Sequence, residues 1–222
     1  MHGTLPTGVP YRPPEEPLLI LHSDASILIV DKPSGLLSVP GKADGLGDCL
    51  ETRLRAIHPE TLLIHRLDMA TSGVMVFART PLAQRHLNWQ FERRQVRKTY
   101  IARVYGHPDT DAGEINLPLI ADWPNRPLQK VCHETGKPAE THWQVLELER
   151  AASRLRLTPR TGRSHQLRVH MRELGHPILG DTFYASGAAL AAADRLQLHA
   201  ETLTFRHPEG GEWITYEAQT PF

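Results

Sequence analysis

The residues best suited to chemistry in this chain lie in one short polar segment, His65 to Gly73. It combines a single carboxylate, Asp68, with a histidine, an arginine and two hydroxyl side chains. Apolar runs on both sides, 62–64 and 74–78, predict short buried strands. A polar loop between core strands can hold a reactive group rigidly. Asp68 is therefore the first candidate for carboxylate chemistry, and an Asx-turn role is the alternative.

Other kinds of catalytic site have weaker support. Thirteen histidines raise the question of a metal, but the pairs His65/Asp68 and His165/His170 lack the HExxH spacing, so no metal site is expected. GxSxG, GxGxxG and P-loop patterns do not occur in the sequence. The two cysteines lie far apart and outside any CxxC motif, which excludes a disulfide framework and favours a reducing, cytoplasmic setting.

Basic residues are segregated along the chain although its formal net charge is zero. Residues 154–172 carry six arginines and two histidines without an acid, and residues 85–103 carry five arginines and one lysine against Glu92 alone. Guanidinium groups bind phosphates in a bidentate manner and stack on bases. The two blocks therefore favour a basic face for a polyanion, with two solvated surfaces as the alternative.

The hydrophobic pattern predicts more strands than helices. Helices are expected over about 47–57, from an N-cap at Thr80 with Pro81 in the first position, and from Ser164 to Leu174. Strand-like runs mostly follow one another along the chain. This order predicts an α+β fold with a mainly antiparallel sheet.

Two segments depart from this pattern. Residues 1–17 are rich in proline, which predicts a mobile tail ahead of a catalytic domain over 18–222. Residues 106–137 are rich in Pro, Gly, Asn and Asp, which predicts a long irregular excursion, and its stretch 123–127 offers an aromatic ring suited to stacking on a base. No apolar run reaches the ~18 residues of a membrane helix.

Five segments, in order, resemble the RluA family of pseudouridine synthases. They are Asp31–Leu36, His65–Gly73, Lys98–Tyr100, Gly162–His170 and His176–Asp181. The resemblance implies the pseudouridine synthase fold, a mainly antiparallel mixed sheet flanked by helices and loops with a central active-site cleft. It begins near Pro17, and no S4-like RNA-binding domain is expected ahead of it.

The resemblance also implies roles for individual residues. Asp68 resembles the nucleophile, which attacks either the ribose C1′ or the uracil C6. Arg168 resembles the arginine that pairs with this carboxylate, Tyr100 the tyrosine that packs on the uracil, and Arg66 the residue that fills the gap left by a flipped nucleotide. By residue type alone, Tyr100 is a core strand tyrosine and Arg66 a surface cation. The other expected RNA-binding residues are His65, Arg93, Arg94, Arg97, Arg126, Arg163 and His165.

The resulting expectation is an RNA pseudouridine synthase, an isomerase without metal or organic cofactor. Its expected substrate is a flipped-out uridine in 23S rRNA and in a tRNA anticodon arm, because residues 122–141 look like the dual-specificity member of the family. We expect a cytoplasmic monomer that needs no protein partner and no membrane. The alternatives are the same catalysis on a single RNA, or a catalytically silent RNA-binding protein, against which the intact Asp68, Tyr100 and Arg168 argue.

Overall fold

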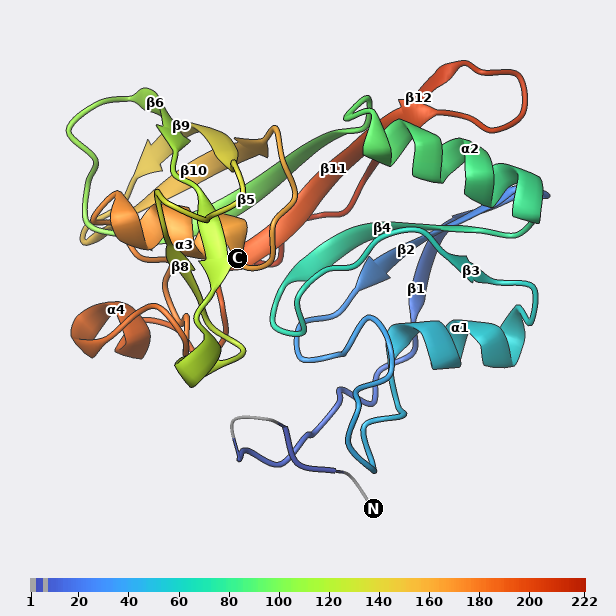
Figure 1. Ribbon diagram of the computed structural model, residues 1–222, viewed down its shortest axis with the longest axis horizontal. Helices are drawn as coiled ribbons and strands as arrows, with labels where there is room; N and C mark the ends of the chain where they lie inside the picture. Colours follow the sequence, from blue (N-terminus) through green and yellow to red (C-terminus); the bar gives the residue numbers. More distant parts are fainter. Residues whose placement is uncertain (1–2, 6–7) are drawn as a thin grey trace. The chain divides into compact units, whose positions relative to one another are not determined.

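The computed structural model describes residues 3–5 and 8–222. The chain divides into two compact units, and the range 18–222, expected as one domain, contributes to both (Figure 1). Unit 1 comprises residues 1–98 and 200–221, and unit 2 comprises residues 99–199 and 222. Each unit is described by itself below.

Unit 1 is built on strands in the order β1-β2-β4-β11, with β3 paired to β4 and β12 paired to β11. These strands are β1 Leu19–Ser23, β2 Ile27–Lys32, β3 Leu62–Leu63, β4 Ser72–Ala78, β11 Leu198–Arg206 and β12 Trp213–Glu217. The pairs β1/β2, β2/β4, β3/β4 and β11/β12 are antiparallel. Every residue of β4 is buried, as its apolar run requires. Helices α1 (Leu50–Ile57) and α2 (Pro81–Glu92) flank these strands (Figure 1).

The glycine that closes the polar segment is required by its packing. Gly73 has φ of 118°, a conformation that L side chains rarely adopt. A Cβ at this position would lie 2.2 Å from the carbonyl oxygen of Ala200 in β11. Gly73 therefore lets the start of β4 approach the neighbouring strand closely, immediately after the loop that carries Asp68.

Unit 2 contains the strand order β5-β10-β9-β6 and a separate β7/β8 hairpin. Its elements are β5 Arg97–Tyr105, which enters from unit 1, β6 Ala112–Asn116, β7 Leu119–Ala121, the 3-10 turn η1 Trp123–Asn125, β8 Gln129–Val131, β9 Glu140–Leu148, β10 Ala152–Pro159, α3 Gln166–Glu173 and α4 Gly187–Ala191. The pairs β5/β10, β10/β9, β9/β6 and β7/β8 are antiparallel. Together the units confirm the predicted α+β class with a mainly antiparallel sheet.

Helix boundaries follow the sequence pattern with one informative exception. The predicted cap of α2 is confirmed, because Thr80 Oγ1 accepts a hydrogen bond from the Ala83 amide at 3.1 Å and Pro81 is the first helical residue. Helix α3 starts later than expected, since its N-cap is His165 and not Ser164. His165 has φ of 53° and makes no side-chain cap hydrogen bond. The Ser164 prediction was therefore wrong, because a strained turn precedes the helix.

The long excursion was also predicted as more irregular than it is. Three of the described strands, β6, β7 and β8, lie within 106–137. Their short runs of three to five residues carry too few apolar positions to show a strand period. Helix α1 begins at Leu50, three residues later than expected, with Cys49 as its N-cap.

The N-terminal tail differs from the mobile segment that its composition predicts. Tyr11 is buried, its hydroxyl donates to the carbonyl of Asp48 at 2.9 Å, and it accepts from the Leu37 amide at 3.0 Å. This aromatic ring, together with the Gly3 amide, which donates to the carbonyl of Gly45 at 2.9 Å, holds the described part of the tail against the rest of unit 1. Residues 1–2 and 6–7 of this tail lie outside the described residues. Within the described ranges, no helix has the length and apolar character needed to span a bilayer.

Candidate active site

The Asp68 loop is tied to the core of unit 1 by its own backbone. Ser38 Oγ donates to the carbonyl of Leu67 at 2.7 Å and accepts from the Leu67 amide at 3.2 Å. The Thr71 amide donates to the carbonyl of Asp68 at 3.1 Å, which closes a turn immediately after the candidate nucleophile. Asp68 itself is half-buried, so part of the residue stays accessible while the backbone around it is held.

A buried lysine also supports the Asp68 loop. Lys32 is 0% exposed, and its ammonium group donates to the carbonyls of Pro33 at 2.9 Å, Leu36 at 2.8 Å and Met69 at 3.0 Å. The Gly35 amide also donates to the carbonyl of Met69, at 2.8 Å. Two of the five family-like segments, 31–36 and 65–73, are therefore one structural unit. Lys32 is a residue whose importance the sequence pattern alone did not reveal.

Two neighbours of Asp68 have different environments. Arg66 is exposed, as a residue that contacts RNA must be. His65 turns inward, where its ring stacks on Phe91 at 4.8 Å and its Nε2 accepts from the Val76 amide at 3.2 Å. Loss of water around the ring, and to a smaller extent the positive charge of nearby Lys98, lowers the pKa of His65 to about 3. His65 is therefore neutral at pH 7 and supports β4, and its expected role in RNA binding stays a prediction.

The arginines that follow α2 are exposed. Arg93, Arg94 and Arg97 all reach solvent, and the Arg97 guanidinium lies 5.2 Å from the centre of the Trp213 ring. The helix ends in a Schellman motif, because the Gln95 amide donates to Gln90 O and the Arg94 amide to Phe91 O. Arg94 occupies the position that favours glycine, with φ of 55°.

In unit 2, Arg168 is held by a buried carboxylate. Its Nε donates to Asp181 Oδ2 at 2.8 Å and its Nη2 donates to Asp181 Oδ1 at 2.6 Å, a bidentate pair with both side chains almost fully buried. Asp181 also accepts from the amides of Phe183 and Tyr184, and both rings lie about 5 Å from the guanidinium carbon. Asp181 stood at the end of the fifth family-like segment, but its role as a partner of Arg168 was not predicted.

The turn before α3 is ordered by a glutamine. Gln166 Oε1 accepts from the hydroxyl of Thr161 at 2.7 Å and from the Arg163 amide at 3.0 Å, while its Nε2 donates to the carbonyl of Glu140. Arg163 is half-buried. His165 Nδ1 lies 2.6 Å from the hydroxyl of Tyr184, which also accepts from the backbone of β8. This network fixes the backbone that presents His165 and Arg163.

The predicted site residues are divided between the two units. Unit 1 holds His65, Arg66, Asp68, Arg93, Arg94 and Arg97, and unit 2 holds Tyr100, Arg126, Arg163, His165 and Arg168. Tyr100 is half-buried on β5, opposite Leu157 of β10. Arg126 is exposed after η1. Each unit therefore carries part of the candidate catalytic set and part of the candidate RNA-binding set.

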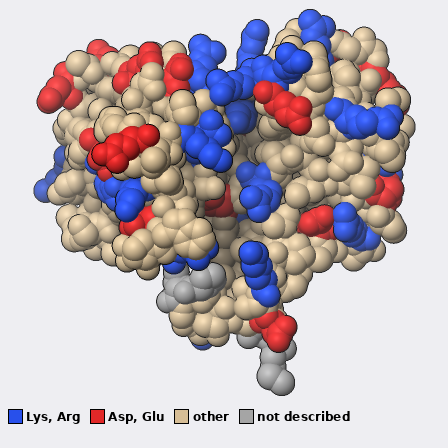
Figure 2. All heavy atoms as spheres, viewed as in Figure 1, with Lys and Arg blue, Asp and Glu red and all other residues tan. Residues whose placement is uncertain are grey.

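Ion pairs reduce the basic character of the two arginine blocks. Figure 2 shows Lys and Arg side chains on the surface, interspersed with Asp and Glu. Three arginines from the blocks pair with carboxylates outside them: Arg103 with Glu149, Arg168 with Asp181, and Arg172 with Glu173. The count of arginines in the sequence therefore overstates the charge that can bind phosphates.

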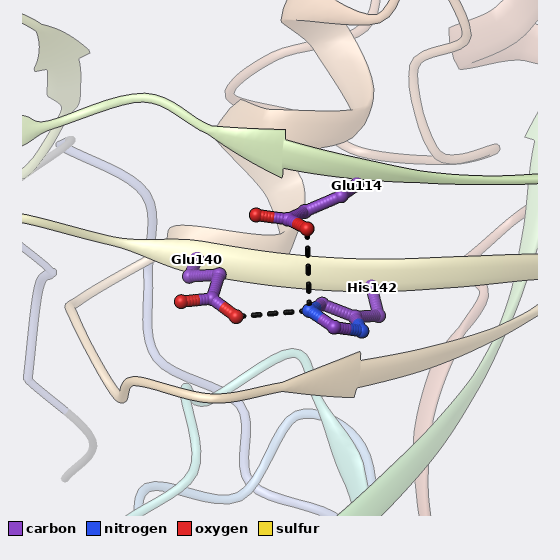
Figure 3. A group of neighbouring side chains, drawn as sticks. All are labelled: Glu114, Glu140 and His142. Atoms are coloured by element: carbon purple, nitrogen blue, oxygen red, sulfur yellow. Dashed lines mark hydrogen bonds and ion pairs between the residues drawn. The ribbon is translucent and has the colours of Figure 1, made fainter.

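One group of described side chains has the donor set of a metal site. Glu114 of β6 lies directly opposite His142 of β9, and Glu140 lies on the same face two residues earlier (Figure 3). His142 Nε2 is 2.8 Å from Glu140 and 3.7 Å from Glu114. Glu114 is exposed and the other two residues are half-buried. The three residues form a surface ion-pair cluster on β6 and β9, apart from the segments that resemble the family.

The comparison with protein families gives a match over the greater part of the chain. Residues 26–173 match a family described as RNA pseudouridylate synthase. A dual-specificity RNA pseudouridine synthase RluA from Salmonella typhi is 56% identical over 214 residues, which cover 96% of this chain and 98% of the relative. The enzyme of the same name from Escherichia coli (strain K12) is also 56% identical, with the same coverage.

Solved structures agree with this assignment. Human RNA Pseudouridylate Synthase Domain Containing 1 has a TM-score of 0.79 at 29% identity, covering 93% of this chain and 85% of the human chain. Human RNA Pseudouridylate Synthase Domain Containing 4 has a TM-score of 0.73 at 27% identity, covering 91% and 88% of the two chains. The chain belongs to the RluA family of RNA pseudouridine synthases, which are RNA isomerases.

Proposed function

We propose that this enzyme converts a uridine to pseudouridine in two kinds of RNA, 23S rRNA and a tRNA anticodon arm. The identity of 56% over 96% of the chain with relatives named dual-specificity enzymes carries this proposal. The resemblance of residues 122–141 to the dual-specificity member supports it. The alternative within the same family is one RNA target.

Asp68 is the proposed nucleophile. Its carboxylate attacks the ribose C1′ or the uracil C6, and the bond between N1 and C1′ breaks. The freed base turns and forms a bond between C5 and C1′, the bond between Asp68 and the substrate breaks, C5 loses its proton, and N1 gains one. Product and substrate contain the same atoms, so the balance needs no cofactor. The Asp68 loop suits this role because buried hydrogen bonds fix its backbone while the carboxylate stays half-exposed.

Arg168 and Tyr100 are the proposed partners of the nucleophile. A guanidinium beside the carboxylate would keep it ionised and aimed at the sugar. The Tyr100 ring would pack on the uracil and help to remove the C5 proton. The bidentate hydrogen bonds from Arg168 to Asp181 support this role of Arg168 beside the nucleophile, because a side chain held at two atoms keeps one orientation.

Backbone strain supports the proposed RNA-binding set. Among the described residues, the non-glycine residues with positive φ are Arg94 and His165, and both were expected to bind RNA. Such conformations cost about 1–3 kcal/mol and cluster at functional sites. Selection for stability alone would favour glycine or asparagine at both positions.

The target uridine must leave the base stack, because a carboxylate cannot reach C1′ or C6 of a stacked nucleotide. Arg66 is the proposed residue that takes its place, since it is exposed two residues from Asp68 and has a planar side chain. Arg66→Ala should lose more single-turnover activity on a structured stem-loop than on a short unstructured RNA. Arg168→Ala should impair both RNAs equally. Equal loss of activity for Arg66→Ala on the two RNAs would leave Arg66 as a general phosphate or structural contact and remove the flipping role.

The experiment that tests the dual specificity uses the purified full chain. Pseudouridine is mapped after incubation with a 23S rRNA transcript and with a tRNA anticodon stem-loop, and in RNA from a strain lacking the gene. Modification of both RNAs by the enzyme, and its loss from both in the deletion strain, is the expected result. Modification of one RNA alone would establish the single-target alternative. We further propose a cytoplasmic monomer, as RNA substrates of these kinds require no membrane or partner.

A further inference from the structure

The tip of the β7/β8 hairpin carries an exposed aromatic side chain with an arginine stacked on it. Trp123, in η1, is 65% exposed. The guanidinium carbon of Arg126 lies 3.4 Å from the centre of the Trp123 ring. This distance is van der Waals contact, so the guanidinium covers one face of the indole. We call these two residues the stacking platform.

Hydrogen bonds within the tip fix the backbone under the platform. The Asp122 carboxylate accepts from the Asn125 side-chain amide at 2.8 Å and from the Lys130 ammonium at 3.0 Å. The Leu128 amide donates to the carbonyl of Asn125, and the Asp122 amide donates to the carbonyl of Leu128. The tip is therefore ordered before any ligand binds, which reduces the entropy that binding must overcome.

The hairpin is also fixed to the helix that carries Arg168. The Gln129 amide donates to the hydroxyl of Tyr184 at 2.9 Å, and Leu128 and Val131 pack against a cluster that contains Val169 of α3 and Tyr184. The stacking platform is thus held by the same packing that surrounds the guanidinium of Arg168. A base bound at the platform would therefore have a fixed position relative to α3.

We propose that the stacking platform binds one unpaired base of the RNA substrate, other than the uridine that reacts. Every base has an aromatic face, and stacking on an exposed ring is tolerant of sequence. An arginine lying flat on the ring extends this surface and directs its N–H groups outward, toward a phosphate or a base edge. Such a site would help one enzyme to accept two RNAs that differ in sequence.

The geometry favours an unpaired base over duplex RNA. In a duplex, both faces of a base are covered by its neighbours, so a protein ring can stack only on a base that has left the helix. This proposal rests on RNA as the substrate of the family, and it does not depend on which two RNAs the enzyme modifies. A solvated tryptophan shielded by an arginine stem is the alternative.

The test compares variants of the full chain for binding to two RNA probes at one fixed salt concentration. The probes are a stem-loop and a fully paired duplex of the same length. Trp123→Ala should weaken stem-loop binding by about 5-fold to 100-fold, the usual effect of one stacked base, and should leave duplex binding unchanged. Trp123→Phe, which keeps an aromatic face, should retain most of the affinity. Arg126→Lys should weaken stem-loop binding, since it keeps the charge but loses the planar group.

A second readout follows the indole directly. Stem-loop binding should quench tryptophan fluorescence in the wild-type enzyme, and Trp123→Phe should reduce that quenching, with three other tryptophans remaining. The matched control is Tyr105→Ala, which removes an aromatic ring of unit 2 that is 39% exposed and should leave both affinities unchanged.

Three results would overturn the proposal. They are stem-loop affinity of Trp123→Ala equal to wild type, an equal loss on duplex and stem-loop, and quenching in Trp123→Phe that is as strong as in the wild type. Pseudouridine formation by the wild-type enzyme is measured on the same stem-loop. Absence of modification with Trp123-dependent binding would count against the proposed substrates and leave the stacking platform in place.

Discussion

The two units fix their candidate catalytic groups with buried charges of opposite sign. In unit 1 the buried cation of Lys32 binds three main-chain carbonyls and so holds the loop that carries Asp68. In unit 2 the buried anion of Asp181 binds the side chain of Arg168 itself. Lys32 thus fixes the backbone of the loop and leaves Asp68 half-exposed, whereas Asp181 fixes the side chain of Arg168 inside the protein.

The difference determines how each site should fail. Removing a buried lysine that binds carbonyls leaves neutral acceptors without a donor, which costs about 1–3 kcal/mol for each group. Removing the partner of a buried arginine takes away two hydrogen bonds and a compensating charge, and typically costs about 3–5 kcal/mol. For Lys32 the total should lie near the lower limit of about 3 kcal/mol, because Pro33 and Met69 are half-buried and the Met69 carbonyl also accepts from the Gly35 amide. The comparison therefore predicts that unit 2 depends on its charge pair at least as strongly as unit 1 depends on its lysine.

The largest expected effect is on catalysis and involves Asp68. Asp68→Asn preserves the shape of the loop but removes the nucleophilic charge, so the single-turnover rate should fall by more than about 10³-fold. RNA affinity, measured by filter binding, should stay near wild type. The control Asp109→Asn alters an exposed acid of unit 2 and should keep full activity. Substantial turnover by pure Asp68→Asn enzyme would remove Asp68 from the role of nucleophile.

The next effect is on the stability of unit 2. Asp181→Ala should lower the free energy of unfolding by about 3–5 kcal/mol, because the Arg168 guanidinium stays buried without this carboxylate. The control Glu173→Ala breaks the exposed pair with Arg172 and should cost less than about 1 kcal/mol. Chemical denaturation measures the free energy of unfolding of both variants. Equal losses would contradict the proposed dependence of unit 2 on the Arg168–Asp181 pair.

A double variant separates stability from catalysis in the same pair. Arg168→Met combined with Asp181→Leu replaces the ion pair with apolar groups, so the part of the stability lost through the unpaired charge should return, while the amides of Phe183 and Tyr184 still lack this acceptor. Pseudouridine formation should remain absent, because the guanidinium is gone. An active double variant would show that Arg168 has no part in the reaction.

A smaller loss is expected from the lysine of unit 1. Lys32→Met should cost roughly 3 kcal/mol, since the carbonyls of Pro33 and Leu36 lose their ammonium donor and the carbonyl of Met69 keeps only the Gly35 amide. The turnover rate should fall while the RNA affinity stays close to wild type, because the carbonyl of Met69, next to Asp68, loses one of its two hydrogen bonds. Lys42→Met, at an exposed position, is the control for loss of charge. A change in RNA affinity with normal turnover would place Lys32 in RNA binding instead.

The pH dependence of stability should report on His65. Its pKa of about 3 in the folded chain lies below the usual value, so the unfolded chain binds a proton that the folded chain does not. Stability should therefore fall as the pH drops below about 6.5, by at most about 2 kcal/mol at pH 5. His65→Gln should flatten this slope, whereas His133→Gln, at an exposed position, should not. Parallel slopes for wild type and His65→Gln would show that the His65 ring is not buried.

The smallest effect concerns the strained end of α2. Arg94→Gly should raise the free energy of unfolding by about 0.5–1 kcal/mol, because the relief of the left-handed backbone exceeds the added freedom of the unfolded chain. The same variant should bind RNA more weakly. Arg94→Ala removes the charge and keeps the strain, so it should weaken binding without the gain in stability. Thermal unfolding measures the stability of both variants, and salt-dependent binding measures their RNA affinity. A stabilised Arg94→Gly with normal RNA affinity would show that the strained backbone at Arg94 does not serve RNA binding.

Local sequence was sufficient for the elements that position the site. The apolar runs around residues 62–64 and 74–78 predicted β3 and β4, and Thr80 with Pro81 predicted the start of α2, because strand period and helix capping depend on neighbouring residues alone. The shorter strands β6, β7 and β8 escaped prediction because their pairing partners, not their own composition, define them. The burial of Tyr11 was not predicted, because a proline-rich composition does not show where one aromatic ring is buried.

The sequence by itself determined the α+β class, the family and the residues that carry its motifs, including Asp68, Tyr100 and Arg168. Only the tertiary structure decided how these residues are supported. Lys32 lies 37 positions from Met69 and Asp181 lies 13 from Arg168, and these hydrogen bonds form only when folding buries the charges together. Tertiary packing also lowers the pKa of His65, since folding removes water from its ring and places Lys98 nearby.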